Sequence, residues 1–373
     1  MRIAFVYDVI YPWVKGGVEK RIYELAKRLA KKNEVHVYGY KLWEGQNLIE
    51  RDGIIYHGTT TPKGLYKNGV RRISPPLNHS IHLIYRISSE HFDVIDCQAS
   101  PYFPAYSSKM SALFRGSNLV ITWHEFWGEY WEDYLGFLGV FGKFIERELF
   151  SLTDNHISVS LKTKKDLMDA GFRGNIHIIP NGIDFKKIRN IKAVGFDSDI
   201  IFVGRLIKEK NVELLLKAVK IIKGEIPDVR IVIIGDGPER TKLESLSKKL
   251  GISSNVNFLG FLETHEEVIA YMKASKVFAF PSLREGFGIV VLEANASGLP
   301  VVTVDHEMNA SKDLIIGRKS GFVTKLDEID FAEKILIALE NRKKMGHIAI
   351  HTAGKYDWNE ITKKLEQYYE GIL

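Results

Sequence analysis

The chain has 373 residues, of which 45% are hydrophobic and 26% charged, and its formal net charge is +6. This length predicts about two domains, each with its own core, and no apolar stretch approaches the roughly 18 residues that a membrane-spanning helix needs. The single cysteine, Cys97, excludes an internal disulfide and argues against a zinc site, so we expect it to be buried filler.

In the first half of the chain, short apolar strands alternate with amphipathic helices. A strand at residues 3–7 begins almost at the N-terminus, which is untypical of a secretory signal peptide and predicts a cytoplasmic protein. A helix at residues 17–31 and strands at residues 35–40, 94–96, 119–122 and 156–159 follow. This order predicts a parallel α/β domain.

A polar stretch at residues 185–199 is interpreted as a linker, and the alternation then starts again. Strands are expected at residues 200–204, 229–235, 256–259, 277–280 and 300–304, with helices at residues 212–222 and 239–250. The fold class is therefore α/β, with two doubly wound Rossmann-like domains, residues 1–184 and 185–356, that face each other across a cleft. Ligands bind such sheets at the carboxyl ends of the strands.

Two features of the first domain are candidates for function. Gly16 and Gly17 lie between the first strand and the first helix and let a ligand approach the backbone closely. Neither GxGxxG nor GxxxxGK[ST] is present, which argues against hydride transfer and simple ATPase chemistry. The strand at residues 119–122 brings His124 and Glu125 to its carboxyl end, where a catalytic histidine could lie, although a lone histidine is more often structural.

An aromatic segment occupies residues 123–150. Positions 127, 131, 134, 138, 141 and 145 form an apolar stripe at helical spacing, which is usually core, but a wall of an acceptor site and a membrane patch stay open. Residues 1–192 carry a net charge of +7 and residues 193–373 a net charge of −1. A basic half can attract phospholipids, lipid phosphates or nucleic acid, or it can be charge that only keeps the protein soluble.

In the second domain, a strand ends at Gly204-Arg205 and Lys210 follows near the start of the next helix. Two cations beside a helix N-terminus would clamp a diphosphate and would stabilise it as a leaving group, because its charge grows in the transition state. The turn Gly235-Asp236-Gly237-Pro238 is explained by turn chemistry alone. Asp197-Ser198-Asp199 precedes a strand and is interpreted as linker, and no other cluster has metal-ligand spacing.

The most informative segment is residues 281–293. It places two carboxylates, Glu285 and Glu293, eight positions apart around the turn Gly286-Phe287-Gly288, directly after a strand and before a helix from Ile289 to Ser297. Amides at a helix start, together with the positive end of the helix dipole, attract phosphate or hydroxyl oxygens. The pattern therefore predicts a site for an anion or a sugar.

Taken together, these residues resemble the retaining glycosyltransferases of family four, which have two Rossmann-like domains (the GT-B fold) and use nucleotide sugars. The resemblance rests on Gly16-Gly17-Val18-Glu19, His124 with Glu125, Pro180-Asn181-Gly182-Ile183-Asp184, Gly204-Arg205 with Lys210, Gly235-Asp236-Gly237-Pro238, and the E-x7-E pattern of Glu285 and Glu293. Three features depart from the family pattern: Asn211 in place of a glycine, Glu125 in place of an aspartate, and residues 306–313 in place of a loop with a Gly-Gly pair.

The resemblance implies a role for each matching residue. Arg205 and Lys210 would bind the donor diphosphate, and Glu293 would hydrogen-bond the ribose. Glu285 and the segment Gly286, Phe287 and Gly288 would hold the transferred sugar, and His124 would lie near the reacting carbon. Gly16 and Gly17 would approach the donor phosphates or the acceptor, the loop at residues 260–265 would read the base, and residues 357–373 would form a helix that packs back on the first domain.

The implied reaction is transfer of a hexose from a nucleotide diphosphate sugar to a hydroxyl of a glycan or lipid-linked acceptor, with retention at the anomeric carbon. No metal and no other cofactor is expected, and no nucleic-acid partner. The basic first half and the aromatic segment also indicate a peripheral contact with an anionic membrane, at its cytoplasmic face. A sugar-nucleotide epimerase, a phosphorylase and a non-catalytic module that binds nucleotide sugars or membranes stay open as alternatives.

Overall fold

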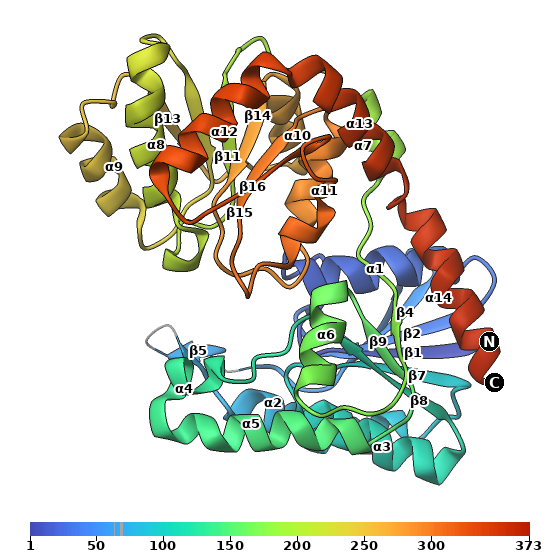
Figure 1. Ribbon diagram of the computed structural model, residues 1–373. Helices are drawn as coiled ribbons and strands as arrows, with labels where there is room; N and C mark the ends of the chain where they lie inside the picture. Colours follow the sequence, from blue (N-terminus) through green and yellow to red (C-terminus); the bar gives the residue numbers. More distant parts are fainter. Residues whose placement is uncertain (63, 68–69) are drawn as a thin grey trace. The chain divides into compact units, whose positions relative to one another are not determined.

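A computed structural model describes residues 1–62, 64–67 and 70–373. The chain divides into two compact units, of which the first is Met1–Asn181 together with Trp358–Leu373 and the second is Gly182–Asp357 (Figure 1). The boundaries expected from the sequence, after residues 184 and 356, lie beside these positions. No helix in the described part of the chain is both long and apolar enough to cross a membrane.

The first unit is built on a sheet of eight strands in the order β10-β9-β8-β7-β1-β2-β4-β3, in which only the pair of β3 with β4 is antiparallel. Its strands are β1 (Arg2–Val6), β2 (Glu34–Gly39), β3 (Leu48–Arg51), β4 (Ile54–Gly58), β7 (Val94–Gln98), β8 (Asn118–Trp123), β9 (His156–Ser158) and β10 (Ile176–Ile178), and β5 (Tyr66–Lys67) pairs separately with β6 (Val70–Arg71).

The helices of the first unit lie between its strands along the chain, apart from α14 at the C-terminus. They are α1 (Gly17–Leu29), α2 (Ser74–Ile87), α3 (Phe103–Arg115), α4 (Tyr130–Leu135), α5 (Gly139–Glu148), α6 (Leu161–Asp169) and α14 (Trp358–Ile372), with the 3₁₀ turns η1 (Gly136–Leu138) and η2 (Leu149–Ser151). The expected strands are confirmed, whereas β3, β4, β5, β6 and β10 were not predicted. Half of the residues of β3 are polar, and β5, β6 and β10 have only two or three residues each.

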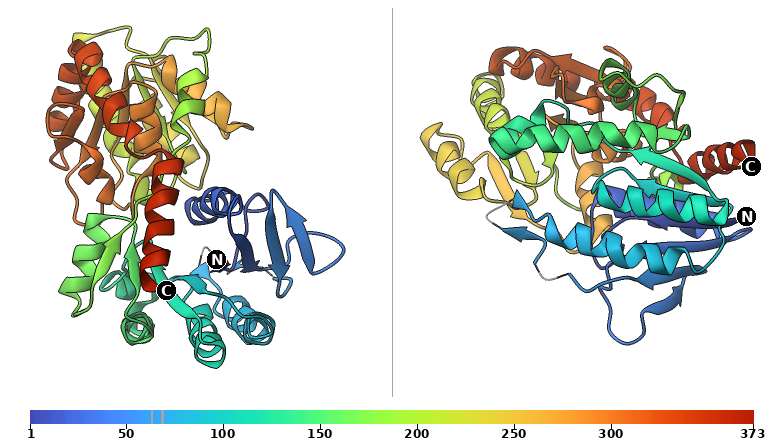
Figure 2. Two further views of the ribbon diagram at one scale, coloured as in Figure 1. Left: turned by 90° about the vertical axis from the view of Figure 1, so that its right-hand side faces the viewer. Right: turned by 90° about the horizontal axis from the view of Figure 1, so that it is seen from below.

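Side chains alternate across this sheet, so each face has its own core. Ile3 and Phe5 pack with α1 and α14, whereas Ala4 and Val6 pack with α2 and α3. Figures 1 and 2 show these two pairs of helices on opposite faces of the sheet. Cys97 belongs to the second core and is fully buried, as expected from the sequence.

The C-terminal helix α14 is part of the first unit. Trp358, Ile361, Leu365 and Tyr369 form a buried stripe at helical spacing, and α14 lies beside α1 (Figure 1). Burying four large side chains contributes roughly 6–12 kcal/mol at about 1.5–3 kcal/mol each. The 15 residues of α14 are therefore an integral part of a domain whose other residues belong to Met1–Asn181.

The second unit has a six-stranded parallel sheet in the order β13-β12-β11-β14-β15-β16. Its elements are α7 (Phe185–Asn190), β11 (Ile200–Val203), η3 (Lys208–Lys210), α8 (Val212–Glu225), β12 (Ile231–Ile234), α9 (Arg240–Lys249), β13 (Val256–Gly260), α10 (His265–Lys273), β14 (Val277–Phe280), α11 (Ile289–Ala296), β15 (Val301–Val304), η4 (Ala310–Leu314), β16 (Gly321–Thr324), α12 (Glu328–Glu340) and α13 (Arg342–Gly354).

The strand order of this sheet reverses between β11 and β14. The chain runs outward from β11 to β12 and β13 on one side, and from β14 to β15 and β16 on the other. In an open α/β sheet this switch point leaves a crevice outside the carboxyl ends of the two strands, where ligands bind. The loops after Val203 and Phe280 therefore occupy the expected position for a ligand site.

The polar stretch at residues 185–199 is not a linker throughout, contrary to the sequence interpretation. It begins with helix α7, which the side chain of Asp184 caps, and Ile188 of this helix is buried. Its last residue, Asp199, accepts hydrogen bonds from Lys276 and from the backbone of Arg230. Asp199, the second acidic residue of the Asp-Ser-Asp triplet, thus links the starts of β11, β12 and β14.

Candidate active site

The residues that the sequence assigns to the donor lie in the second unit, around the switch point of its sheet. Arg205 follows β11, Lys210 ends η3, and Glu285 follows β14. The two loops are joined by backbone contacts, since the amide of Leu283 donates to the carbonyl of Glu209 at 2.8 Å. The fold therefore brings the loop that carries both cations beside the loop that carries Glu285, although 75 positions separate Lys210 from Glu285.

Lys210 and Glu285 form an ion pair with each other. Their side chains are 16% and 13% exposed, and the ammonium of Lys210 also lies 5.4 Å from the centre of the Phe280 ring. Both charges are thus partly withdrawn from water. An ion pair in such a partly buried position is stronger than a pair at the surface. The Lys210 ammonium has three donors, so a phosphate can share it with Glu285.

Arg205 differs from Lys210 in being exposed. Within the described residues, its guanidinium makes no hydrogen bond or ion pair. The loop that carries Arg205 packs closely on the residue that follows β12, Gly235. This glycine has a φ of 129°, and a Cβ on it would lie 1.9 Å from the carbonyl oxygen of Gly204. The glycines of this turn are explained by that close approach, and they leave the arginine beside the carboxyl end of the strand.

The backbone conformation of Asn211 explains how an asparagine can stand where the family pattern has a glycine. It has φ 49° and ψ 40°, which is the left-handed conformation, and it directly precedes α8. Glycine adopts this conformation most readily, and asparagine tolerates it better than other residues do. The substitution therefore keeps the turn that follows Lys210.

The Gly-Phe-Gly turn leads directly into α11, as predicted. Gly288 has a φ of 92°, and a Cβ at this position would lie 2.5 Å from the Cβ of Ser311. Gly286 is half-buried, whereas Phe287 is buried and its ring lies 6.1 Å from that of Tyr356. The phenyl group of Phe287 is thus a packing group, and only the backbone of this residue can serve a ligand.

Glu293 lies in α11, where it is 7% exposed. Its Oε1 is 2.8 Å from Nε2 of His265, the first residue of α10. The sequence placed base recognition in the loop at residues 260–265 without assigning a role to His265. The structure shows that this histidine orients the carboxylate that was assigned to the ribose.

The loop at residues 306–313, which departs from the family pattern, supports the backbone of Glu285. The amide of Glu285 donates to the carbonyl of Met308 at 2.9 Å, and the amide of Ala310 donates to the carbonyl of Glu285 at 2.9 Å. Asn309 is fully buried, and its Nδ2 donates to the carbonyl of Val304 at 3.0 Å. Sequence reasoning missed Asn309, because a buried asparagine has no sequence signature of its own.

In the first unit, His124 follows β8 and is held by a chain of hydrogen bonds. Its Nε2 lies 2.8 Å from Oε1 of Gln98, and the amide nitrogen of Gln98 donates to Oδ1 of Asp96 at 2.9 Å. Asp96 also accepts from Thr122 at 2.8 Å and from the hydroxyl of Tyr369 at 2.6 Å. Because a carboxylate only accepts, the Gln98 amide points its oxygen at His124, which assigns the proton to Nε2 and leaves Nδ1 as an acceptor.

Burial lowers the pKa of His124 to about 3, and the positive charge of Arg21 contributes to the same shift. This imidazole is therefore neutral at physiological pH. Arg21 is itself buried, and its guanidinium donates to the carbonyl oxygens of Ile179 and Pro180 and to Oδ1 of Asn181. The sequence analysis did not single out Arg21, because one arginine within an amphipathic helix resembles an ordinary surface residue.

The glycine loop at the start of α1 is occupied by a side chain of its own helix. Glu19 is buried, burial raises its pKa, and hydrogen bonds from its own amide and that of Gly16 oppose this shift. A Cβ at Gly16 would lie 2.6 Å from Oε1 of Glu19. The amides near Gly16 and Gly17 thus already hold a carboxylate, and an incoming phosphate would have to displace it.

Asp8, just after β1, is a second acidic residue at the carboxyl edge of this sheet that sequence reasoning missed. It is fully buried and forms an ion pair with Arg71. Burial raises the pKa of Asp8, and the Arg71 guanidinium opposes the shift. Glu125, in turn, accepts a hydrogen bond of 2.6 Å from the indole of Trp127, so its carboxylate anchors the start of the aromatic segment.

Two family models match the chain and together span residues 15–353. Residues 15–187 match the family described as Glycosyltransferase Family 4, and residues 184–353 match the family described as Glycosyl transferases group 1. The phosphatidylinositol N-acetylglucosaminyltransferase gpi3 subunit of Schizosaccharomyces pombe is 24% identical, over 98% of this chain and 80% of its own length. The D-inositol 3-phosphate glycosyltransferase of Corynebacterium jeikeium is 30% identical, over 59% of each chain.

Solved structures share the whole fold. Sucrose-phosphate synthase from Thermosynechococcus elongatus has a TM-score of 0.81 at 18% identity, with 100% of this chain and 98% of that chain covered. Anabaena Alr3699/HepE in complex with UDP has a TM-score of 0.77 at 18% identity, with both chains covered completely. The chain therefore has the GT-B fold and belongs to the glycosyltransferases of family four.

Proposed function

We propose that this glycosyltransferase moves a hexose from a nucleotide diphosphate sugar to a hydroxyl of a glycan or lipid-linked acceptor, with retention at the anomeric carbon. The observation that carries the proposal is the grouping of Arg205, Lys210 and Glu285 at the switch point of the second sheet. This position receives ligands in doubly wound sheets. An epimerase or a phosphorylase could use the same fold, but the named relatives and the matching families favour transfer.

The two cations act on the leaving group in this proposal. As the bond to the anomeric carbon breaks, negative charge grows on the diphosphate while the sugar becomes positively charged. Groups that bind the developing charge more strongly than the ground state lower the barrier. Arg205 offers a planar fork of donors that matches a phosphate, and Lys210 offers a point charge. This chemistry uses no metal ion.

Glu285 serves as a sugar-binding group rather than as a nucleophile. A retaining glycosidase would use such a carboxylate to attack the anomeric carbon. The ion pair with Lys210 instead ties the carboxylate to the group that binds the phosphate. We propose that its free oxygen and the amides of the turn at Gly286 and Gly288 hold sugar hydroxyls, while the departing phosphate removes the proton of the acceptor hydroxyl on the same face.

The remaining assigned residues orient the two substrates. Glu293, held by His265, accepts from the ribose hydroxyls. His124 is neutral, and its Nδ1 can accept a hydrogen bond from a hydroxyl of the transferred sugar or of the acceptor. Gly16 and Gly17 approach the donor phosphates or the acceptor once the carboxylate of Glu19 leaves the amide of Gly16.

The acceptor side of the proposal includes a contact with an anionic membrane. Helices α2 and α3 pack against each other and, with α5, lie on the same face of the first sheet (Figure 2). The outer sides of α2 and α3 carry exposed apolar residues, namely Leu77, Ile81, Tyr85, Met110, Leu113 and Phe114. The two helices contain three basic residues, Arg86, Lys109 and Arg115, and no acidic residue. Apolar side chains beside cations are typical of proteins that bind anionic bilayers.

The aromatic segment adds to this surface. Its predicted single stripe is divided, because the chain turns at Gly136, which has a φ of 58°, between α4 and α5. Trp123 belongs to the second core of the first unit, and four further side chains of the segment pack against this core, namely Phe126, Trp131, Ile145 and Phe150. By contrast, Phe137, Phe141 and Phe144 are more than half exposed. We propose that the exposed rings lie at the cytoplasmic face of the membrane, beside a lipid-linked acceptor.

Liposome sedimentation tests the membrane contact. Vesicles that contain anionic lipid should pellet the protein at low salt, and added salt should release it, because electrostatic attraction is screened. Replacement of Leu113 and Phe114 by serine should weaken the binding, whereas replacement of the exposed Phe261 of the second unit by serine should not. Equal sedimentation with neutral and anionic vesicles would reject this part of the proposal.

The substrates are identified by direct assay. UDP-, GDP- and ADP-sugars form the donor panel, in which UDP-sugars have priority because a structural neighbour was solved with UDP and with UDP-glucose. Phosphatidylinositol and inositol phosphate belong in the acceptor panel because two relatives are named for transfer to such compounds. Retention is tested by NMR of the product, and inversion of the donor configuration would reject it.

A further inference from the structure

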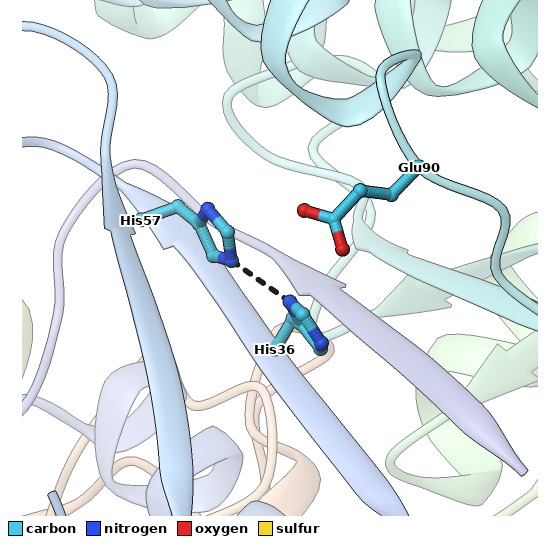
Figure 3. Close-up of side chains that lie close together, drawn as sticks. All are labelled: His36, His57 and Glu90. Atoms are coloured by element: carbon cyan, nitrogen blue, oxygen red, sulfur yellow. Dashed lines mark hydrogen bonds between the residues drawn. The ribbon is translucent and has the colours of Figure 1, made fainter. Parts of the chain in front are cut away.

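We propose that His36, His57 and Glu90 of the first unit form a binding site for a divalent transition-metal ion of the zinc type (Figure 3). The ligand atoms of the three residues all lie within 4.8 Å of one another. No step of the proposed transfer reaction uses this site. It would act on stability, and it does not depend on the proposed function.

Three separate elements bring the ligands together. His36 is in β2 and His57 is in β4, two residues apart in the register of these neighbouring parallel strands, since His36 pairs with Ile55 and Tyr38 pairs with His57. Glu90 comes from the turn between α2 and β7. Figure 3 shows the carboxylate of Glu90 pointing toward the two imidazoles. The spacing along the chain contains no metal signature, which is why the sequence analysis expected no metal.

The two imidazoles are already in contact. Nδ1 of His36 lies 2.8 Å from Nε2 of His57, and both residues are buried, at 2% and 6% exposure. A zinc ion about 2.0–2.1 Å from each nitrogen in a tetrahedral arrangement would hold them roughly 3.3 Å apart. The rings would therefore have to separate by only about half an ångström to admit the ion.

A carboxylate outside the proposed ligand set orients His36. Nε2 of His36 lies 2.9 Å from Oε1 of Glu34, so a proton on Nε2 leaves Nδ1 free as a ligand. Metal-binding histidines commonly donate their second nitrogen to a carboxylate in this way, which fixes the ring and raises its basicity. His57 is fixed by its neighbour instead, because its ring stacks on Tyr38 with centres 4.2 Å apart.

The hydrogen bond between the two rings suits a metal. With the proton of His36 on Nε2, its Nδ1 accepts from Nε2 of His57. Binding would move the His57 proton from Nε2 to Nδ1 without a net release, and the ion would take the place of the hydrogen bond between the rings. Glu34 and Glu90 share the guanidinium of Arg2, and the positive charge of Arg86 also acts on His57, so the proposal rests on the placement of the ligand atoms rather than on the net charge around them.

Glu90 completes the set from the solvent side. Its side chain is 32% exposed, which gives an ion access from water and leaves room for a water molecule as a fourth ligand. The carboxylate accepts from Arg2 at 2.7 Å through Oε2. The other oxygen can bind the ion while this contact is kept. An occupied site would join β2, β4 and the turn before β7, and so stabilise the first unit.

The test uses the full-length protein, stripped with a chelator and titrated with Zn²⁺ alone. We expect one bound ion per chain by elemental analysis after desalting, and a rise in the melting temperature of several degrees at saturating zinc. His57→Gln should abolish both effects, and Glu90→Gln should weaken binding by 10- to 100-fold. His91→Gln, which removes an exposed histidine beside Glu90, should leave both effects unchanged.

Two results would overturn the proposal. The first is that the stripped wild-type protein, after titration with Zn²⁺ and desalting, retains no zinc and shows no shift in melting temperature. The second is a zinc-dependent shift of the same size in the wild type, in His57→Gln and in Glu90→Gln, since this would place the ion elsewhere. Glu90→Gln changes a half-buried side chain, so the test stands even where His57→Gln fails to fold.

Discussion

Tyr369 in the last helix donates a hydrogen bond of 2.6 Å to Oδ2 of Asp96 in β7, although 273 positions separate the two residues. Both are fully or almost fully buried. Burial raises the pKa of Asp96, while the hydroxyl of Tyr369 and the other donors to the carboxylate oppose this shift. The end of the chain thus completes the hydrogen-bond chain through Gln98 that orients His124.

Removing this hydroxyl should destabilise the first unit and disturb His124. We expect Tyr369→Phe to lower the free energy of unfolding by about 1–2 kcal/mol, because Asp96 keeps its buried charge but loses one of its donors. Urea unfolding followed by circular dichroism measures the change. The control is Tyr368→Phe, at a half-buried neighbour whose ring lies against His177, and it should leave stability nearly unchanged. Equal effects of the two variants would contradict the assignment.

Arg205 should affect catalysis more than stability. We expect Arg205→Ala to lower kcat by about 10²–10³-fold, because a charge that binds the leaving diphosphate is lost. The side chain is exposed, so the melting temperature should hardly change. Steady-state kinetics with the donor that the panel of nucleotide sugars selects measures the effect. Lys208→Ala removes an exposed cation three positions away, and a loss of kcat as large as that of Arg205→Ala would show a general charge effect instead.

Lys210 should show both effects. Lys210→Ala leaves the carboxylate of Glu285 partly buried without its partner, which we expect to cost about 1–3 kcal/mol of stability in addition to activity. The double variant Lys210→Ala, Glu285→Ala should recover part of the stability but none of the activity. A double-mutant cycle from chemical unfolding measures the coupling, and a coupling energy near zero would contradict a functional ion pair.

The turn before α11 should not tolerate a side chain at Gly288. Gly288→Ala meets both a left-handed backbone and the Cβ of Ser311 at 2.5 Å, so we expect a loss of at least about 1–3 kcal/mol. Combination with Ser311→Gly should relieve the clash but not the backbone strain. Gly195→Ala, at an open position without a positive φ, serves as the control. A melting temperature of Gly288→Ala equal to that of the wild type would contradict the described turn.

Acid should weaken the first unit through buried neutral histidines. Burial lowers the pKa of His79 to about 3, so between pH 3 and about 6.5 the unfolded chain binds a proton that the folded chain does not. Stability from this residue is therefore fully present above about pH 6.5 and is lost as the pH falls. We expect His79→Gln to make unfolding less dependent on pH between 7 and 5, by roughly 1–2 kcal/mol, in urea titrations at the two pH values. The exposed His82→Gln should keep the slope of the wild type, and an unchanged slope in His79→Gln would refute this cause.

Much of the fold could be predicted from the sequence, because its strands are short apolar runs and its helices have clear apolar stripes. The strand after Ser275 and the glycine turn before α11 were recognised from composition and glycine positions. β3 was missed because Leu48–Arg51 is a largely exposed edge strand of which half the residues are polar. β4 was missed although Ile54–Gly58 contains an apolar run. Helix α7 was missed because only Ile188 of its six residues is buried.

Those residues of the candidate site could be predicted whose residue type and position at a strand end together indicate a role. Arg205, Lys210 and Glu285 follow strand ends, and sheet topology alone brings such positions together. Pairwise relations could not be predicted in this way, because they depend on side chains that approach each other only in the folded chain. The ion pair between Lys210 and Glu285 and the contact of His265 with Glu293 are of this kind. The metal ligands proposed in the first unit are a further case.

The most direct test of the proposed transferase activity is the release of free nucleoside diphosphate from the donor panel, with chelator present, by the wild type and by the Arg205→Ala, Glu285→Ala double variant. We predict that the wild type turns over one donor, faster when an acceptor hydroxyl is supplied, and that the double variant is inactive although it remains folded. Chelation should leave turnover intact at temperatures well below melting, even where it removes a stabilising ion. Turnover by the double variant at the rate of the wild type would contradict the roles proposed for Arg205 and Glu285, and no turnover with any pair of donor and acceptor would contradict the proposed transferase activity.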